Sequence, residues 1–237
     1  LLKGKGYIVP KSRNSLGQWT ESTNELTLKK LRLRHKDDQD IERLLSFAHL
    51  NKGLSSYIRT KYHVDGRVRF SLNIHGTETG RFACRKDAFD CGFNAQTISK
   101  EYAGYLVAPS RRVWLEIDLQ KAESFFVAYD SCESTLIDML HSGGDIHKYV
   151  AAEIYGKPQD EVTKGERQLG KKSGHGANYS MGPATFQDTC LKEMNLVLSK
   201  KAAQNALDAY FRAFPKIRDW QKQIELEVRR KRFLSNP

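Results

Sequence analysis

The 237-residue sequence lacks a long apolar run, has few cysteines, and contains no internal repeat or low-complexity tract. No stretch approaches the roughly 18 consecutive apolar residues of a membrane span, and the first residues lack the apolar core of a signal peptide. We therefore expect no membrane partner and a cytoplasmic location. The four cysteines include no C-x-x-C pair, which argues against a zinc site and a dense disulfide framework. Free thiols are expected instead.

The sequence has fewer acidic than basic residues: 28 Asp and Glu against 39 Lys and Arg, which gives a net charge of +11. Such a balance favours a polyanionic partner, either nucleic acid or an acidic membrane surface. Without a membrane segment, nucleic acid is the better candidate. The hydrophobic share of 39% is ordinary for a folded protein, and the length allows one or two domains.

Apolar periodicity predicts helices toward both ends of the chain and a mixed region between them. The expected helices cover residues 22–33, 40–57, 121–140, 145–155, 165–179, 183–194 and 198–232, the last broken near Phe214-Pro215. Alternating residues predict strands at 68–75 and 113–118. Because the strands fall between helical regions without a regular alternation, the sequence predicts an α+β fold.

Asp118 follows the second predicted strand, where side chains commonly face a cleft. Its carboxylate, with the backbone carbonyl of Leu119, can hold Mg²⁺ beside triphosphate oxygens. Alternatively, Asp118 is a helix cap or turn residue. Glu123 lies five residues later and otherwise belongs to a solvated helix face.

Arg167, Lys171, His175 and Tyr179 recur every four residues and would form one row on a helix. The two cations could clamp a triphosphate, while the imidazole and the phenol could pack on a sugar and a base. The alternative is a basic helix with a solvated face. Three glycines between 170 and 176 argue against that alternative, because each costs a helix roughly 1 kcal/mol relative to Ala. They suggest the close approach of a ligand or of another backbone.

Three further segments carry weaker signals. His147 follows Asp145 at a predicted helix start, which favours an anion contact or a simple cap with a surface histidine. Arg81 follows a glycine turn and could reach a nucleic-acid groove or phosphate, or remain solvated. Asn94 and Gln96 carry amides that can read acceptors in the minor groove.

Taken in order, these segments resemble DNA polymerase family A, the bacterial repair type and its phage relatives. The matching segments are Thr77-Glu78-Thr79-Gly80-Arg81 (T-x-T-G-R), Asn94-Ala95-Gln96-Thr97-Ile98 (N-x-Q-N-I), Asp118 to Glu123 (D-x-S-Q-x-E, motif A), Asp145-Ile146-His147 (D-I-H) and Arg167 to Ser180 (R-x-x-x-K-x-x-x-[FY]-x-x-x-Y-G, motif B). Residues 22–58 resemble the thumb of the family and residues 211–236 its later fingers.

The resemblance implies a right-hand architecture, with a helical thumb and helical fingers beside part of an antiparallel palm sheet. Residues 1–70 would form the thumb, 71–125 the first palm segment and 126–237 the fingers. It also implies template-directed DNA synthesis from deoxynucleoside triphosphates on a primer-template, with two Mg²⁺ ions, in a bacterial or phage-infected cell.

The resemblance also implies residue roles. Asp118 would hold both metal ions, with Leu119 as a further ligand near the nucleotide, and Glu123 would exclude a ribose 2′-hydroxyl. His147, Arg167 and Lys171 would bind the triphosphate, Lys171 would protonate pyrophosphate, His175 would contact the nucleotide, and Tyr179 would stack near the templating base. Arg81, Asn94 and Gln96 would contact the duplex.

The sequence departs from the family pattern in several places. His175 stands where Phe or Tyr is usual, Ser180 replaces Gly, and Gln120-Lys121 replaces Ser-Gln. The H-D-E motif with the second metal-binding Asp, motif C, is missing, and no exonuclease domain is visible. We therefore expect a truncated or split polymerase that synthesises negligible DNA without a complementary segment carrying motif C. The alternatives are a DNA-binding or assembly subunit that needs a second chain for activity, and a nucleotide-binding regulator.

Overall fold

A computed structural model describes residues 2–13, 17–77 and 80–231. The chain divides into two compact units, Leu1–Ile117 and Asp118–Pro237. Glu78 and Thr79 of the T-x-T-G-R motif lie outside the described residues. So do Arg232 and Asn236, at the ends of the last predicted helix and of the predicted fingers.

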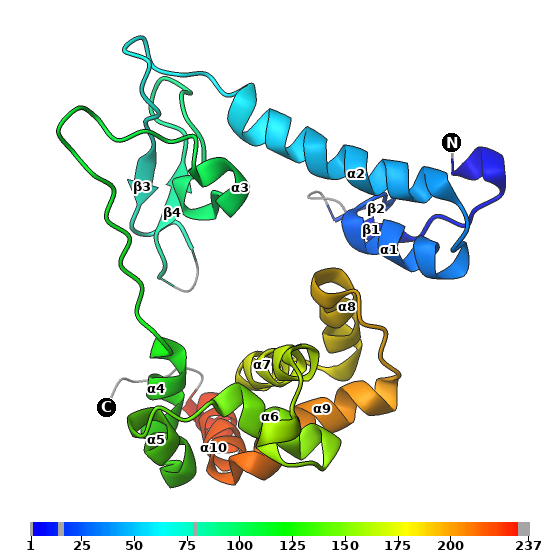
Figure 1. The fold of residues 1–237 in the computed structure, drawn as a ribbon, viewed down its shortest axis with the longest axis vertical. Helices are drawn as coiled ribbons and strands as arrows, with labels where there is room; N and C mark the ends of the chain where they lie inside the picture. Colours follow the sequence, from blue (N-terminus) through cyan, green and yellow to red (C-terminus); the bar gives the residue numbers. More distant parts are fainter. Residues whose placement is uncertain (1, 14–16, 78–79, 232–237) are drawn as a thin grey trace. The chain divides into compact units, whose positions relative to one another are not determined.

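A pair of helices dominates the start of the first unit: α1 (Glu25–Arg34) packs on α2 (Gln39–Gly53) (Figure 1). Asn24 caps α1, because its side chain accepts a hydrogen bond from the Thr27 backbone N–H. Both helices were predicted from periodicity. The second ends earlier than expected, at Gly53, and continues as one π-helical turn (Leu54–Ile58).

The strands of the first unit form two short antiparallel hairpins. β1 (Lys11–Arg13) pairs with β2 (Trp19–Glu21), and β3 (Ser71–Asn73) pairs with β4 (Ala83–Arg85). The predicted strand 68–75 is thus confirmed for its central part. The remaining short elements of this unit are η1 (Lys3–Lys5), η3 (Ala95–Thr97) and α3 (Lys100–Ala103).

Polar contacts tie the N-terminal segment of the first unit to its helix pair. The Asp38 carboxylate accepts hydrogen bonds from Lys5 Nζ at 2.8 Å and from the Tyr7 hydroxyl. These two bonds, with a third from the Asp40 backbone N–H, lower the pKa of Asp38 to about 2. The apolar cluster of this unit consists of Leu2, Leu28, Leu31 and Ile41, and Tyr7 packs against it.

The predicted strand at 113–118 is wrong. Residues 112–119 are extended but form no ladder with any described strand. The apolar side chains of this segment are all 69% exposed or more: Val113, Trp114, Leu115 and Ile117. A strand is stabilised by a hydrogen-bonded neighbour and by burial of at least one face, and this segment has neither within the described residues.

The second unit is helical. Its elements are α4 (Ala122–Asp130), α5 (Ser134–His141), α6 (Ile146–Tyr155), η4 (Gln159–Glu161), α7 (Lys164–Asn178), α8 (Pro183–Met194), α9 (Lys200–Ala213) and α10 (Pro215–Lys231). The single helix expected at 121–140 is wrong, because the chain breaks after α4. Cys132 adopts a left-handed φ of 51° there, a conformation that a continuous helix does not allow. The other predicted helices of this unit are confirmed within about two residues.

The core of the second unit lies where α6, α7, α8 and α9 meet (Figure 1). Phe186, Phe214 and Ile217 are fully buried in it. Gly170 lets α7 approach α6 closely, because a Cβ atom at this position would collide with the His147 carbonyl oxygen and the Ala151 backbone nitrogen. One expectation for the glycines of α7, the close approach of another backbone, is therefore confirmed at Gly170.

No helix in the described part of the chain is both long and apolar enough to cross a membrane. The four cysteines are free thiols, as expected, with Cys132 exposed and Cys84, Cys91 and Cys190 buried.

Candidate functional site

The helix α7 separates its residues into a buried face and an exposed row. Leu169, Gly170, Ser173, Gly176 and Ala177 are buried against the neighbouring helices. Arg167 is partly exposed, and Lys171, His175 and Tyr179 are exposed. A capping box fixes the start of the helix: the Thr163 hydroxyl accepts from the Glu166 backbone N–H, and the Glu166 carboxylate accepts from the Thr163 backbone N–H. The four-residue spacing thus produces the expected row.

Arg167 is held in place by Asp145, the residue that caps α6. The Asp145 carboxylate accepts from Arg167 Nε at 2.7 Å and from the backbone N–H groups of His147 and Lys148 at 3.1 Å. Partial burial acts to raise the pKa of Asp145, but these hydrogen bonds outweigh it and the pKa lies below its usual value. Because the contact uses Nε, the two terminal nitrogens of the guanidinium remain available to a ligand.

His147 lies close to the cations of the row. Burial lowers the pKa of its imidazole, and the nearby charges of Arg167, Lys171 and Lys121 lower it further, against the opposing effect of Asp145. The imidazole is therefore neutral at pH 7. A neutral ring can donate one hydrogen bond to a phosphate oxygen without adding charge. The structure thus brings His147, Arg167 and Lys171 together, and their binding of a triphosphate stays a prediction.

Lys171 and Lys121 differ in their surroundings. Lys171 is exposed and has no hydrogen-bond or ion-pair partner among the described residues. Lys121 Nζ donates to the Gly144 carbonyl oxygen at 3.2 Å, which brings it to the residue before Asp145. Sequence reasoning did not count Lys121 as a site residue, although its place inside motif A, where Gln is usual, was a usable signal.

Glu123 connects α4 to the end of α7. Its carboxylate accepts a hydrogen bond from the Tyr179 hydroxyl at 2.9 Å and lies 3.8 Å from His175 Nδ1. The rings of His175 and Tyr179 are 4.8 Å apart between centroids. Three of the predicted residues therefore form one contiguous polar and aromatic cluster at this end of the helix.

Asp118 and Leu119 lie in the extended stretch before α4, and not at the tip of a strand as predicted. The Asp118 carboxylate is exposed and has no hydrogen-bond or ion-pair partner in the described ranges, and the Leu119 side chain is 77% exposed. No group of three or more His, Cys, Asp or Glu side chains that could hold a metal ion is found among the described residues.

Comparisons with known proteins identify the family of the chain. The sequence model of the family "DNA polymerase family A" matches residues 5–236, nearly the whole chain. The chain belongs to DNA polymerase family A. Among the curated relatives of this family A chain, DNA polymerase I of Aquifex aeolicus is 24% identical over 213 residues, which cover 90% of the chain and 36% of the relative. The DNA polymerase of Bacillus phage SP01 is 27% identical over 190 residues, which cover 76% of the chain and 20% of the relative.

The fold is shared with a solved polymerase domain. The domain of Pol1 from M. smegmatis, in complex with a DNA primer-template and a dNTP, is similar with a TM-score of 0.71 and 21% sequence identity. The match covers 96% of this chain and 39% of that one. It confirms the predicted fold class, a mostly helical α+β polymerase architecture. The chain spans about a third or less of the first curated relatives.

The predicted DNA-contacting residues of this polymerase chain belong to the first unit. The side chain of Asn94 caps a short helical turn by accepting from the Gln96 backbone N–H at 3.0 Å, so its oxygen is engaged within the protein. The Arg81 carbonyl oxygen accepts from the Thr77 hydroxyl at 2.8 Å. All three side chains, Arg81, Asn94 and Gln96, are exposed. Their contact with DNA stays a prediction.

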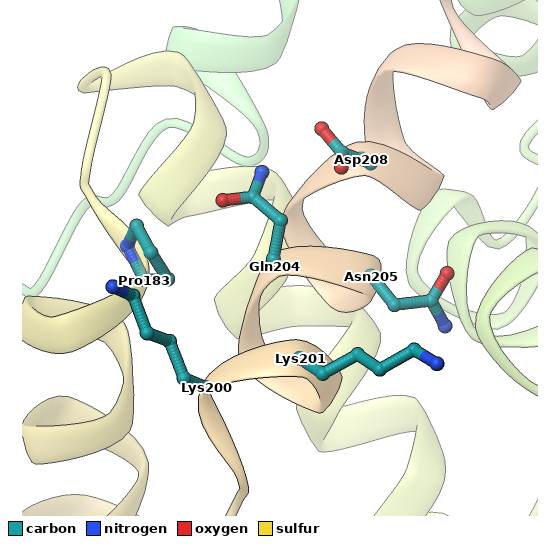
Figure 2. A pocket seen from close by; sticks show the side chains of 6 residues that line it. All are labelled: Pro183, Lys200, Lys201, Gln204, Asn205 and Asp208. Atoms are coloured by element: carbon teal, nitrogen blue, oxygen red, sulfur yellow. The ribbon is translucent and has the colours of Figure 1, made fainter.

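A surface hollow of about 490 Å³ lies elsewhere in the second unit, beside the start of α9 (Figure 2). Its lining residues are Pro183, Lys200, Lys201, Gln204, Asn205 and Asp208. None of them was predicted as a site residue. Charge, exposure and mutual contacts identify the row on α7 and its neighbours as the stronger candidate.

Proposed function

We propose that this chain carries the nucleotide-binding part of a template-directed DNA polymerase, which transfers a nucleotide from a dNTP to a primer 3′-hydroxyl. One observation carries the proposal: Arg167, Lys171 and His147 lie together beside the capped start of α6, with free guanidinium nitrogens and a free ammonium group. Two cations beside a neutral hydrogen-bond donor suit a triphosphate. Family membership supports the same chemistry.

The other roles follow the family pattern. Residues 1–70 would serve as thumb, 71–125 as first palm segment and 126–237 as fingers. Glu123 would meet the sugar and Tyr179 the templating base, with His175 beside both, while Arg81, Asn94 and Gln96 would contact the primer-template. Lys171 would also donate a proton to the departing pyrophosphate, since it is an unpaired ammonium group in the cluster.

Metal binding is proposed for Asp118 and the Leu119 carbonyl. An exposed, unpaired carboxylate fits one oxygen ligand of Mg²⁺, which usually keeps several waters and uses one or two carboxylates with substrate phosphates. When bound, two Mg²⁺ ions would activate the primer hydroxyl and stabilise the leaving pyrophosphate. Asp118 would supply one such carboxylate, and a complementary segment would supply the second.

Binding of dNTP by the isolated chain tests the nucleotide site. We expect Arg167→Ala to weaken dATP binding roughly tenfold or more, because it removes a charge-assisted hydrogen-bond donor. Isothermal titration calorimetry at fixed salt measures the change. Lys164→Ala, at the exposed start of the same helix, is the matched control and should bind like wild type. Equal dATP affinities in all three proteins would refute the site.

A second candidate function is a DNA- or nucleotide-binding subunit that depends on a second chain for activity. The exposed segment 113–119 and the lone Asp118 favour it, because both lack partners among the described residues. Primer extension separates the two. We expect negligible synthesis by the chain alone, and synthesis when a polypeptide carrying H-D-E is added. If Asp118→Ala leaves the reconstituted activity intact, Asp118 has no catalytic role and the binding-subunit function is correct.

A further inference from the structure

We propose that Lys121 is an additional phosphate-binding residue of the nucleotide site, and that it binds the triphosphate together with Arg167 and Lys171. The inference rests on the proposed nucleotide-binding function and adds a residue to it. Its starting point is the contact of Lys121 Nζ with the Gly144 carbonyl oxygen, next to the Asp145 that positions Arg167.

The backbone directs Lys121 toward this place. Lys121 has a left-handed φ of 57° immediately before the first residue of α4, a conformation that a residue with a side chain seldom adopts. The turn brings an ammonium group from the start of α4 to the start of α6, 23 residues later in the sequence. The position of Lys121 is therefore set by the local chain path, since both segments belong to the second unit.

The present partner of Lys121 is weak. A neutral carbonyl at 3.2 Å satisfies one of the three donors of an ammonium group, and the side chain remains exposed. A phosphate oxygen carries a negative charge and forms a shorter and stronger bond with the same donor. Lys121 can thus turn to a phosphate at little cost, or keep the carbonyl bond and donate with its other hydrogens.

The charges around the start of α6 leave an excess of positive charge. The positive charges of Arg167, Lys171 and Lys121 each lower the pKa of the His147 imidazole, so all three act on the same ring. Asp145 is the carboxylate that acts on the same imidazole, and Arg167 forms an ion pair with it. Cations that lie close together repel one another, and a polyanion bound between them relieves that repulsion. Gln, the usual residue at this position in the motif, could not supply this charge.

Nucleotide binding by Lys121→Gln tests the inference. We expect the affinity for dATP to fall roughly three- to tenfold, as for the loss of one exposed or partly exposed charge contact. The affinity for deoxyadenosine should stay unchanged, because the nucleoside has no phosphate. Lys121→Arg should retain most of the affinity for dATP. Lys201→Gln, in the hollow beside α9, makes the same charge change elsewhere in the unit and should bind like wild type.

A second measurement follows the histidine directly. In an NMR titration of the free protein, Lys121→Gln should raise the pKa of His147, because a neighbouring positive charge is removed. An unchanged His147 pKa would show that the ammonium group is not near the site, and the inference would be wrong.

The outcomes separate this inference from the proposed function. If Arg167→Ala weakens dATP binding and Lys121→Gln does not, the nucleotide site stands and the role of Lys121 is refuted. If wild type binds no dATP, both are refuted. If Lys201→Gln lowers the affinity for dATP as much as Lys121→Gln does, the change in net charge alone explains the effect. That result would also overturn the inference.

Discussion

The two compact units are stabilised in different ways. In the second unit, one continuous apolar core joins all the major helices, and Phe186, Phe214 and Ile217 are fully buried in it. In the first unit, a small apolar cluster around Ile41 is supplemented by polar contacts such as those of Asp38. The comparison teaches that Arg167 and Lys171, the cations of the proposed nucleotide site, lie on a helix packed into the core, whereas the segment that leads into Asp118 packs against none of the described residues.

Removal of core volume from the second unit should give the largest effect. Phe186 is 0% exposed and packs against α7, and Phe186→Ala should lower the free energy of unfolding by roughly 3–5 kcal/mol. Urea denaturation followed by far-UV circular dichroism measures it. If Phe186→Ala costs no more than a surface substitution, the second unit is not held by the core described above.

The contact between α6 and α7 gives the next largest effect. Gly170→Ala places a Cβ atom against the backbone of α6 and should cost roughly 1–3 kcal/mol of unfolding free energy. Gly165→Ala is the matched control on the same helix, because nothing lies within 4 Å of its added Cβ. It should stabilise the protein by about 0.4–1 kcal/mol. Both values come from denaturant titrations, and the two substitutions should differ in sign.

Acid should weaken the capping box of α7. Hydrogen bonds from Lys157 and then from Thr163 lower the pKa of Glu166 from 4.5 to about 2. A depressed pKa in the folded state contributes stability above pH 4.5, and this contribution is lost as the pH falls toward 2. Glu166→Gln should therefore destabilise the protein at pH 7 and have less effect near pH 2. Thermal unfolding across this range measures the difference, and a pH-independent difference contradicts the assignment.

Substitution in the extended segment should have the smallest effect. Leu115 is 79% exposed, so Leu115→Ser should change the unfolding free energy by no more than about 0.5 kcal/mol in the isolated chain. Equilibrium unfolding of the two proteins under one set of conditions provides the measurement. A loss above about 2 kcal/mol would show that the segment packs against the protein and would remove the contrast between the two regions.

The sequence predicted local features well and cooperative features poorly. The spacing of Arg167, Lys171, His175 and Tyr179 sufficed for their row, because a helix fixes which residues share a face. The prediction of a strand at 113–118 was wrong because alternation of apolar residues is a local property, whereas a strand also needs a neighbouring strand to which it can hydrogen-bond. The break at Cys132 and the approach of Lys121 to Gly144 could not be read from periodicity, since both depend on the packing of α4, α5 and α6.

The glycine at position 170 has a consequence for motion. The backbones of α6 and α7 are in contact at Gly170. No flexible side chain lies between them there that could adjust if one helix moved relative to the other. Any displacement of α7 would therefore carry α6 with it. The distance between the His147 imidazole on α6 and the Arg167 and Lys171 side chains on α7 would then stay the same while the two helices move together.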